Sequence, residues 1–247
     1  MPESMGDPCL ESVPDPAEVA WTFRIRGRRT PWDWIDGPPD MRQLQSYRRP
    51  ASGSGSRHVP VRAFSYTIGA YLALESGLEH DLLRRLDRDP SVTWLVSQPF
   101  ALGWDVAARR TRKSHVPDLI SLASDGAVTV WDVKSPEGAA SSKFAEVREV
   151  SRQACEERGW GYEVFTGLGP THRHNLLWLH AYRRRQPWVD HYEDDLIAAC
   201  DGGAKLGDLV RARRSHEYLA AIWHLIWAGH LKVDLAQRLT GASEVTT

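Results

Sequence analysis

Cysteine is scarce in this chain of 247 residues, whose three cysteines, Cys9, Cys155 and Cys200, stand far apart. An odd number of isolated cysteines excludes a disulfide framework and a CxxC zinc site, and it is typical of the reducing cytoplasm. Long apolar runs are also absent, since no stretch approaches the ~18 residues that a membrane helix needs. The acidic amino-terminal segment has neither a basic start nor an apolar core, so we expect no membrane span and no secretory signal.

Net charge is lacking as well, because 31 basic and 32 acidic side chains leave a formal charge of −1. No global field therefore draws the protein to DNA or to anionic lipid, and any nucleic-acid contact must come from local patches. Lysine is rare, since only five of the 31 basic residues are lysines and the rest are arginines. A lysine inside an apolar segment is therefore a candidate for a specific role.

Composition and hydrophobic pattern divide the chain into three segments. Residues 1–60 carry frequent Pro and Gly and a Ser–Gly run at 52–56, which indicates a partly irregular extension with one short strand at 21–26. Residues 61–188 alternate predicted helices and strands. Residues 189–247 favour short helices followed by an extended stretch, the pattern of a winged-helix-like region.

The middle segment has the pattern of an α/β domain, for which we expect a mixed central sheet flanked by helices. Apolar residues at helical spacing predict helices at 75–88, 141–158 and 175–184. Strand patterns are found at 92–98, 100–106, 115–123, 127–134 and 161–166. A Ser124-Asp125-Gly126 turn joins two of these strands into a hairpin.

That hairpin holds the most informative residues of the chain. If its turn centres on Asp125, paired positions sum to 250, and Asp118 lies directly opposite Asp132 with Cβ atoms about 5 Å apart. Side chains alternate along a strand, so Asp132 and Lys134 share one face. Lys134 closes an otherwise apolar strand.

Two carboxylates at that distance repel one another unless a cation lies between them. Mg²⁺ suits such a pair because it takes oxygen ligands and retains water, which becomes acidic enough to attack phosphorus. Lys134 would add positive charge there. Glu79 lies on a predicted helical stripe with Leu82, Leu83 and Leu86, so a metal or a base is expected beside it. The alternative is a solvated strand edge, where Asp and Lys are common neighbours.

These residues resemble the PD-(D/E)xK pattern of restriction-enzyme-like nucleases. A wider set of stretches is similar to the TnsA family of transposon-end endonucleases, especially its actinobacterial forms, over about residues 60–185, with a weaker similarity in the winged-helix region. The matching stretches are Glu75-Ser76-Gly77-Leu78-Glu79, Ser97-Gln98-Pro99-Phe100, His115-Val116-Pro117-Asp118, Asp125-Gly126, Asp132-Val133-Lys134, Ala154-Cys155, Gly159-Trp160-Gly161-Tyr162, Asn175-Leu176-Leu177-Trp178-Leu179 and Tyr182-Arg183.

The resemblance implies a restriction-endonuclease-like core and a Mg²⁺-dependent enzyme, with Mn²⁺ as a substitute ion, that cuts the 5′ side of transposon ends in double-stranded DNA. A separate RNase H-type transposase would make the 3′ cut, and an ATPase would regulate both. By position, Glu79, Asp118, Asp132 and the Val133 carbonyl would bind metal, and Lys134 would be the catalytic lysine. Some relatives carry glutamine at the position of Asp132, which leaves the number of metal ions open.

Two accessory candidates are Gln98 and His115. Gln98 ends a predicted strand, where a glutamine is usually solvated unless it lies at the site. His115 precedes Asp118 by three residues and so is expected on the opposite face of the strand, in contact with phosphate. A basic cluster just before the Asp118 strand is a candidate for contacts to the DNA backbone, although such runs are usually solvated; it consists of Arg109, Arg110, Arg112 and Lys113.

The predicted helix at 216–228 contains no Arg, Lys, Asn or Gln, the residues with which a helix reads base edges. Its apolar stripe favours a core or partner surface, so we expect a docking module rather than a sequence reader.

Three hypotheses follow for a cytoplasmic protein. The first is the endonuclease subunit of a heteromeric transposase. The second is a stand-alone restriction or repair nuclease that uses the same residues. The third is a non-catalytic assembly factor that binds DNA or the transposase without a metal.

Overall fold

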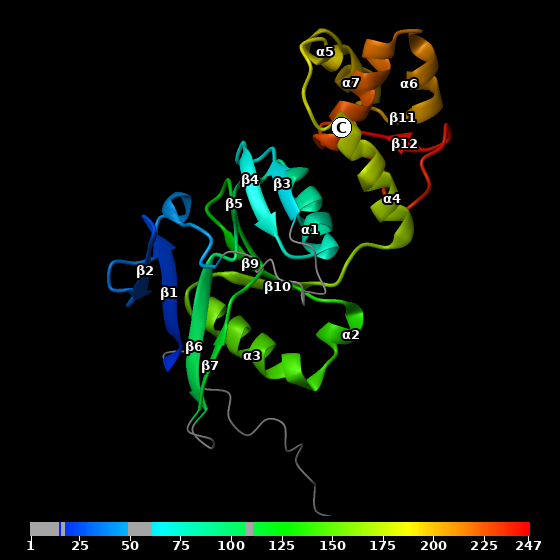
Figure 1. Ribbon diagram of the computed structural model, residues 1–247. Helices are drawn as coiled ribbons and strands as arrows, with labels where there is room; N and C mark the ends of the chain where they lie inside the picture. Colours follow the sequence, from blue (N-terminus) through cyan, green and yellow to red (C-terminus); the bar gives the residue numbers. More distant parts are fainter. Residues whose placement is uncertain (1–14, 16–17, 49–60, 107–110) are drawn as a thin grey trace, which may run out of the picture. The chain divides into compact units, whose positions relative to one another are not determined.

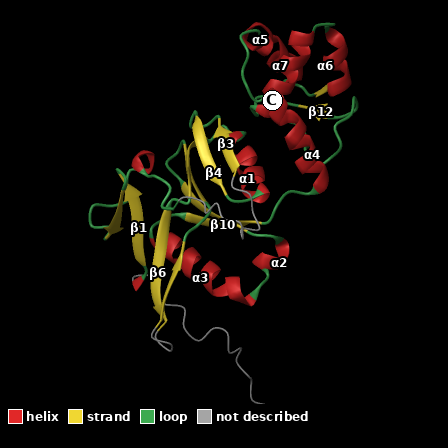
Figure 2. Cartoon of the chain, viewed as in Figure 1, coloured by secondary structure: helices red, strands yellow, loops and turns green. Residues whose placement is uncertain are grey.

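The computed structural model describes residue 15 and residues 18–48, 61–106 and 111–247. This part of the chain is a mixed α/β structure with several small sheets (Figures 1 and 2). It separates into two compact units. The first unit comprises Met1–Val61, Ala73–Glu75 and Trp94–Thr166, and the second Arg62–Leu72, Ser76–Thr93 and Gly167–Thr247, each in its described residues.

Two four-stranded sheets form the first unit, instead of the single central sheet predicted. One sheet has the order β2-β1-β6-β7 and is antiparallel throughout. The other has the order β10-β9-β8-β5, with β8 and β9 antiparallel and β9 and β10 parallel. The strands are β1 (Ala20–Ile25), β2 (Arg28–Trp32), β5 (Val92–Ser97), β6 (Phe100–Val106), β7 (Thr111–His115), β8 (Leu119–Ala123), β9 (Val128–Val133) and β10 (Gly161–Phe165).

The short strand predicted at 21–26 in the amino-terminal extension is present as β1, and a second strand, β2, follows it. Strand β1 pairs with β6 from Ala20↔Gly103 to Phe23↔Phe100. Trp21 and Phe23 are 2% and 0% exposed because the aromatic positions of β1 alternate and face the core. The segment therefore completes a sheet of the first unit.

Helix α3 (Ser142–Glu157) covers the second sheet of this unit, and Figure 1 shows it alongside β10. The helix begins at Ser141, whose hydroxyl accepts the Phe144 N–H. Its buried residues join those of the sheets in one apolar core, together with the ring of Trp160. The short helix α2 (Pro136–Ala139) and a 3₁₀ turn at Met41–Gln43 complete the unit.

The second unit is mainly helical. Its carboxy-terminal part runs helix, strand, helix, helix, strand, and its two short strands pair antiparallel. A hairpin of β3 (Val61–Ser65) and β4 (Ala70–Leu74) forms a separate two-stranded sheet. The remaining elements are α1 (Gly77–Asp87), α4 (Pro170–Leu179), a 3₁₀ turn at His180–Tyr182, α5 (Val189–Cys200), β11 (Ala204–Lys205), α6 (Leu206–Ala212), α7 (His216–Trp227) and β12 (Glu244–Val245).

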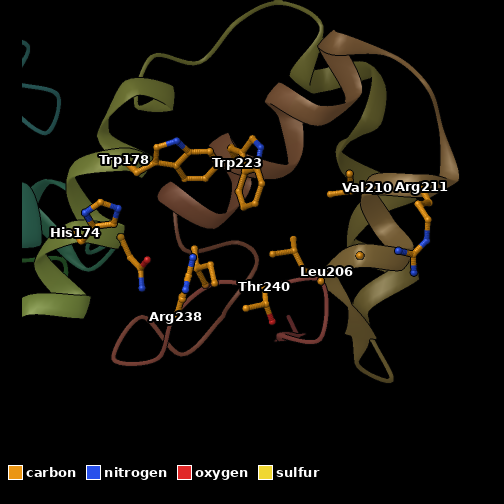
Figure 3. A pocket seen from close by; sticks show the side chains of 12 residues that line it. His174, Trp178, Leu206, Val210, Arg211, Trp223, Arg238 and Thr240 are labelled. Carbon is orange, nitrogen blue, oxygen red and sulfur yellow. The ribbon is translucent and has the colours of Figure 1, made fainter.

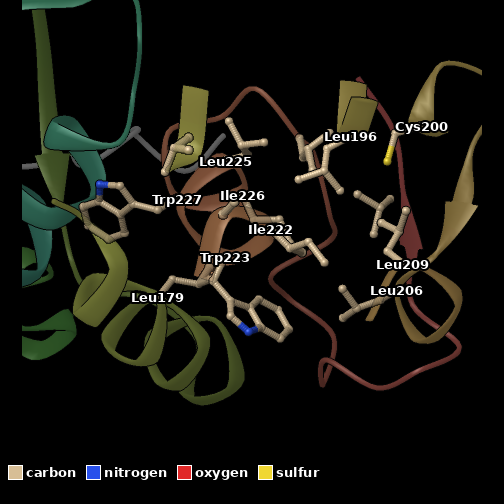
Figure 4. Packing of buried hydrophobic residues seen from close by; sticks show 14 of the residues in the cluster. Leu179, Leu196, Cys200, Leu206, Leu209, Ile222, Trp223, Leu225, Ile226 and Trp227 are labelled. Atoms are coloured by element: carbon tan, nitrogen blue, oxygen red, sulfur yellow. The ribbon is translucent and has the colours of Figure 1, made fainter. Parts of the chain in front are cut away.

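Helix α7 is the core of this unit, which is one of the two alternatives, core or partner surface, that its apolar stripe indicated. Ile222, Leu225 and Ile226 are fully buried, and Figure 4 shows them among leucines from the surrounding helices. Gly229 follows the helix with a φ of +78°, the left-handed conformation that commonly ends a helix. The helix therefore serves packing, and it presents no base-reading side chain.

The predicted boundary at 188 differs from the structural one. Leu176 and Leu179 of α4 pack in the same apolar cluster as α7, and the last segment of the second unit begins at Gly167. Helix α1 belongs to it as well, and Arg88 at its end donates to the Ile226 carbonyl at 3.1 Å. No helix within the described ranges is long and apolar enough to cross a membrane.

Candidate metal centre

The hairpin of β8 and β9 has the predicted register. Leu119 pairs with Trp131 and Leu122 with Val128, so paired positions sum to 250. The Ala123 N–H donates to the Ala127 carbonyl at 2.8 Å, which closes a three-residue turn. Gly126 takes a φ of +88° in that turn, a conformation that favours glycine.

Asp118 lies just outside the ladder, at the entrance to β8. Its backbone N–H donates to the Trp131 carbonyl at 2.9 Å. Its carboxylate Oδ2 accepts the Val133 N–H at 2.7 Å and the Lys134 ammonium at 3.2 Å. Asp118 is 8% exposed and Asp132 is 0% exposed, so the solvated strand edge considered above does not describe this pair.

The Lys134 ammonium lies where three oxygen atoms converge. Its Nζ is 3.2 Å from Asp118 Oδ2, 3.0 Å from the Val133 carbonyl oxygen and 3.6 Å from Asp132 Oδ1. The Phe144 ring lies 5.3 Å from the same nitrogen. These three oxygens belong to the groups that the sequence analysis assigned to a metal, and in the structure they share one cation.

Asp132 is held from its other side by two residues. His115 Nε2 lies 2.9 Å from each carboxylate oxygen, and the Tyr162 hydroxyl donates to Oδ2 at 2.6 Å. The sequence analysis gave Tyr162 no role of its own. In the parallel pairing Tyr162 lies beside Val130, two residues before Asp132 and so on the same face. That register is long-range and carries no local sequence signal.

His115 is directed at the site, which corrects the expectation that it faces away from Asp118. The predicted strand at 115–123 is two strands, because β7 ends at His115 in one sheet and β8 begins at Leu119 in the other. Alternation of faces applies only within a continuous strand, and the chain crosses between sheets at Val116–Asp118.

Electrostatics separate the two aspartates. Burial raises the pKa of Asp118 and the Asp132 charge adds to this, so the pKa stays above its ordinary value despite Lys134. Burial also acts to raise the pKa of Asp132, but His115, Lys134 and the Tyr162 hydroxyl outweigh it, and this pKa is lowered. Burial acts to lower the pKa of Lys134, whereas both carboxylates raise it, and the net pKa is raised. Lys134 is therefore a protonated donor at neutral pH.

Gln98 is buried beside this centre. Its backbone N–H donates to the Asp118 carbonyl at 2.8 Å, and the residue is 1% exposed. Its φ of +49° is unusual for a residue other than glycine, and neither its Oε1 nor its Nε2 has a hydrogen-bond partner in the described structure. A buried unbonded amide costs about 1–3 kcal/mol, so Gln98 is an accessory candidate and not a solvated strand end.

Glu79 is buried on α1 together with the leucines of its stripe, as the helical pattern predicted. Its Oε1 accepts the Ser76 hydroxyl at 2.9 Å, and its N–H donates to Ser76 Oγ at 3.1 Å, so Ser76 is the N-cap of the helix. Helix α1 belongs to the second unit, whereas the two aspartates belong to the first. The participation of Glu79 in the metal site stays a prediction.

The basic cluster is described only in part, because Arg109 and Arg110 lie outside the described residues. Arg112 is exposed on β7, opposite Asp105. Lys113 forms an ion pair with Glu146 of α3. Among the predicted DNA contacts that the structure describes, Arg112 is exposed to solvent, whereas Lys113 is paired with Glu146.

The donor set at Lys134 fits a hard cation. Carboxylate and carbonyl oxygens are the ligands that Mg²⁺ prefers, and a single positive charge already sits among them. Within the described ranges, no three side chains of His, Cys, Asp or Glu are grouped as a metal cluster. Two carboxylates and one backbone carbonyl would therefore hold the ion in this unit.

No protein-family model matches the chain, and no curated protein matches it closely enough to indicate a family.

Proposed function

We propose that this protein is a metal-dependent DNA endonuclease of the TnsA type, the subunit of a heteromeric transposase that hydrolyses the 5′ side of transposon ends. The observation that carries the proposal is the convergence of Asp118, Asp132 and the Val133 carbonyl on the Lys134 ammonium. All four residues belong to the motif on which the resemblance rests, and this agreement supports the proposal.

Each residue of the centre has a chemical role in this proposal. Asp118, Asp132 and the Val133 carbonyl would hold the ion, and Glu79 would be the fourth ligand. A bound Mg²⁺ supplies a Lewis acid for the scissile phosphate and lowers the pKa of a water nucleophile. The Lys134 side chain is 30% exposed, so its ammonium group is accessible to a phosphate and would stabilise negative charge on it.

The remaining contacts orient these groups. His115 and Tyr162 hold the Asp132 carboxylate by three hydrogen-bond contacts, which fixes its plane. His115 shares the oxygen Oδ1 with Lys134, and Tyr162 donates to Oδ2. Gln98 has a free amide beside Asp118, and it is the proposed accessory group for a phosphate oxygen or the attacking water.

The proposal is tested by Mn²⁺ binding and by Mg²⁺-dependent cleavage of duplex DNA carrying transposon ends, with and without the partner transposase. Asp118→Asn should abolish 5′ nicking and weaken Mn²⁺ binding about a hundredfold or more, because it removes a charged ligand. Asp125→Asn, an exposed aspartate in the turn of the same hairpin, is the matched control and should change neither.

Other outcomes would assign a different function. Unchanged cleavage by Asp118→Asn would contradict the proposal. Cleavage without the transposase would indicate a stand-alone nuclease. DNA or transposase binding that needs no metal and is unaffected by Lys134→Ala, in the absence of any cleavage, would indicate an assembly factor.

A further inference from the structure

The second unit contains a cavity that the proposed nuclease chemistry does not use. It has a volume of about 500 Å³ and lies among α4, α6, α7 and the segment 238–241 (Figure 3). All of its lining residues belong to the second unit. Its volume falls within the range of about 300–1,000 Å³ that is typical of small-molecule sites.

One side of the cavity is aromatic. Trp178 is 43% exposed, one of the few large apolar side chains of the described structure that reach solvent. Its ring meets the ring of the buried Trp223 edge to face, with centroids 4.4 Å apart and planes at 81°. The core therefore supports the Trp178 indole from one side and leaves part of it open to the cavity, as Figure 3 shows.

The rim of the cavity is cationic. Its lining includes Arg211, Arg238 and His174, and no aspartate or glutamate. Arg211 is paired with the exposed Asp208 on its own helix. Arg238 forms no ion pair within the part of the chain that the structure describes, and Figure 3 shows it rising toward the two tryptophans. An anionic ligand with a flat aromatic surface complements this lining.

The segment that carries Arg238 is held in place by hydrogen bonds. The buried Asn175 amide donates to the Leu235 carbonyl at 2.9 Å and to the Gln237 carbonyl at 2.7 Å. The Gly207 N–H donates to the Gly241 carbonyl at 2.9 Å. A Cβ at position 207 would lie 2.9 Å from that oxygen, so only glycine permits the approach. The cavity is thus formed before any ligand binds, which lowers the entropy cost of binding.

We propose that this cavity binds a nucleotide, whose base stacks on Trp178 and whose phosphate pairs with Arg238 and Arg211. Stacking on an open tryptophan requires a flat π-system, and the cationic rim requires an anion; a nucleotide provides both in one ligand. An acidic peptide would satisfy the rim but has no need of the open indole. The binding chemistry is the same for a free nucleotide and for an unpaired nucleotide of a DNA strand. Binding of an unpaired nucleotide of a DNA strand rests on the proposed nuclease function.

The test measures binding to the full chain in EDTA by calorimetry. The probes are deoxyadenylate, deoxyadenosine, a single-stranded hexathymidylate, a blunt duplex and an acidic peptide with one phenylalanine. Deoxyadenylate or the single strand should bind, and deoxyadenosine should bind at least about tenfold more weakly because it lacks the phosphate. Tighter binding of the single strand than of deoxyadenylate assigns the site to DNA, and equal binding assigns it to free nucleotides.

Variants identify the residues. Trp178→Ala and Arg238→Ala should each weaken binding about tenfold or more, and Trp178→Phe should retain most of it because a flat ring remains. Leu177→Ala and Arg214→Ala alter exposed neighbours outside the cavity and should leave the dissociation constant unchanged. Thermal unfolding of each variant verifies that the second unit is intact.

Binding of the peptide alone, binding of no probe, or nucleotide binding insensitive to both Trp178→Ala and Arg238→Ala would overturn the inference. Its failure is distinguishable from failure of the nuclease proposal, because Asp118→Asn should leave nucleotide binding unchanged. A chain that binds deoxyadenylate but cuts no DNA keeps the nucleotide site and loses the nuclease. A chain that cuts DNA but binds no probe keeps the nuclease alone.

Discussion

In the first unit, Asp118, Asp132 and Lys134 lie together at the ends of β-strands. The Asp118 carboxylate accepts hydrogen bonds from the Val133 N–H and the Lys134 ammonium, and the Asp132 carboxylate accepts one from the Tyr162 hydroxyl. In the second unit, α7 buries Ile222, Leu225 and Ile226 in an apolar cluster. The difference is in what each core stabilises. Burial of the charged groups of the first unit costs free energy, which the rest of the fold must offset. Burial of α7 removes apolar surface from water, which is favourable.

The largest effect is expected in the apolar core. Ile226→Ala should lower the free energy of unfolding by about 2–5 kcal/mol, because it removes a fully buried side chain and leaves a cavity. Mn²⁺ binding at the first unit should be unchanged under native conditions. Urea denaturation measures the free energy of unfolding. Glu217→Ala, on the exposed face of the same helix, is the control. A loss below 1 kcal/mol would show that α7 is not the core described here.

Smaller changes in the free energy of unfolding, of opposite sign, are expected when each of the two aspartates is replaced and no metal is present. Asp132→Asn should lower the free energy of unfolding by about 1–3 kcal/mol, because its charged form is stabilised by His115, Tyr162 and Lys134. Asp118→Asn should leave it unchanged or raise it by about 1 kcal/mol, since a raised pKa means that the fold disfavours the charged form.

The pH dependence follows the same signs. A group with a lowered pKa contributes stability above its unfolded pKa and loses it as the pH falls through the folded value, which applies to Asp132. A group with a raised pKa destabilises the fold above that pKa, and acid relieves the cost, which applies to Asp118. Urea titrations of the two variants from neutral to acidic pH measure these slopes. Equal destabilisation by both substitutions would remove the distinction between the two aspartates.

The smallest effect is expected in the hairpin turn. Gly126→Ala should cost about 1 kcal/mol, because alanine is strained at a φ of +88° although nothing lies within 4 Å of the added Cβ. Gly202→Ala, in the second unit, also has open space but no positive φ in the left-handed range, so it should be neutral or slightly stabilising. Comparable losses for both glycines in thermal unfolding would contradict the role of backbone conformation.

Local patterns predicted much of the fold. The alternation at 127–134 predicted β9, the apolar spacing at 141–158 predicted α3, and the apolar stripe at 216–228 predicted a helix that serves as core or as partner surface. The turn at Ser124-Asp125-Gly126 also predicted the register of the hairpin, because a three-residue loop leaves one pairing. These features depend on residues close together in the chain.

Contacts between distant residues could not be predicted in this way. The pairing of β1 with β6 joins residues about 80 positions apart, and no local signal indicates with which strand β1 pairs. The single strand predicted at 115–123 is divided between two sheets, which moves His115 onto Asp132. The contact of Tyr162 with Asp132 depends on a parallel register that forms across α3.

The amino-acid sequence by itself determined the chemistry of this protein's candidate centre. Turn geometry and side-chain alternation bring Asp118, Asp132 and Lys134 to one end of a hairpin, since all three lie within 17 residues of chain. Only the tertiary structure decided how that chemistry is held: which groups bury the aspartates, which donors separate their pKa values and which unit carries each element. Burial and long-range hydrogen bonds arise when distant segments pack, and no spacing within one segment encodes them.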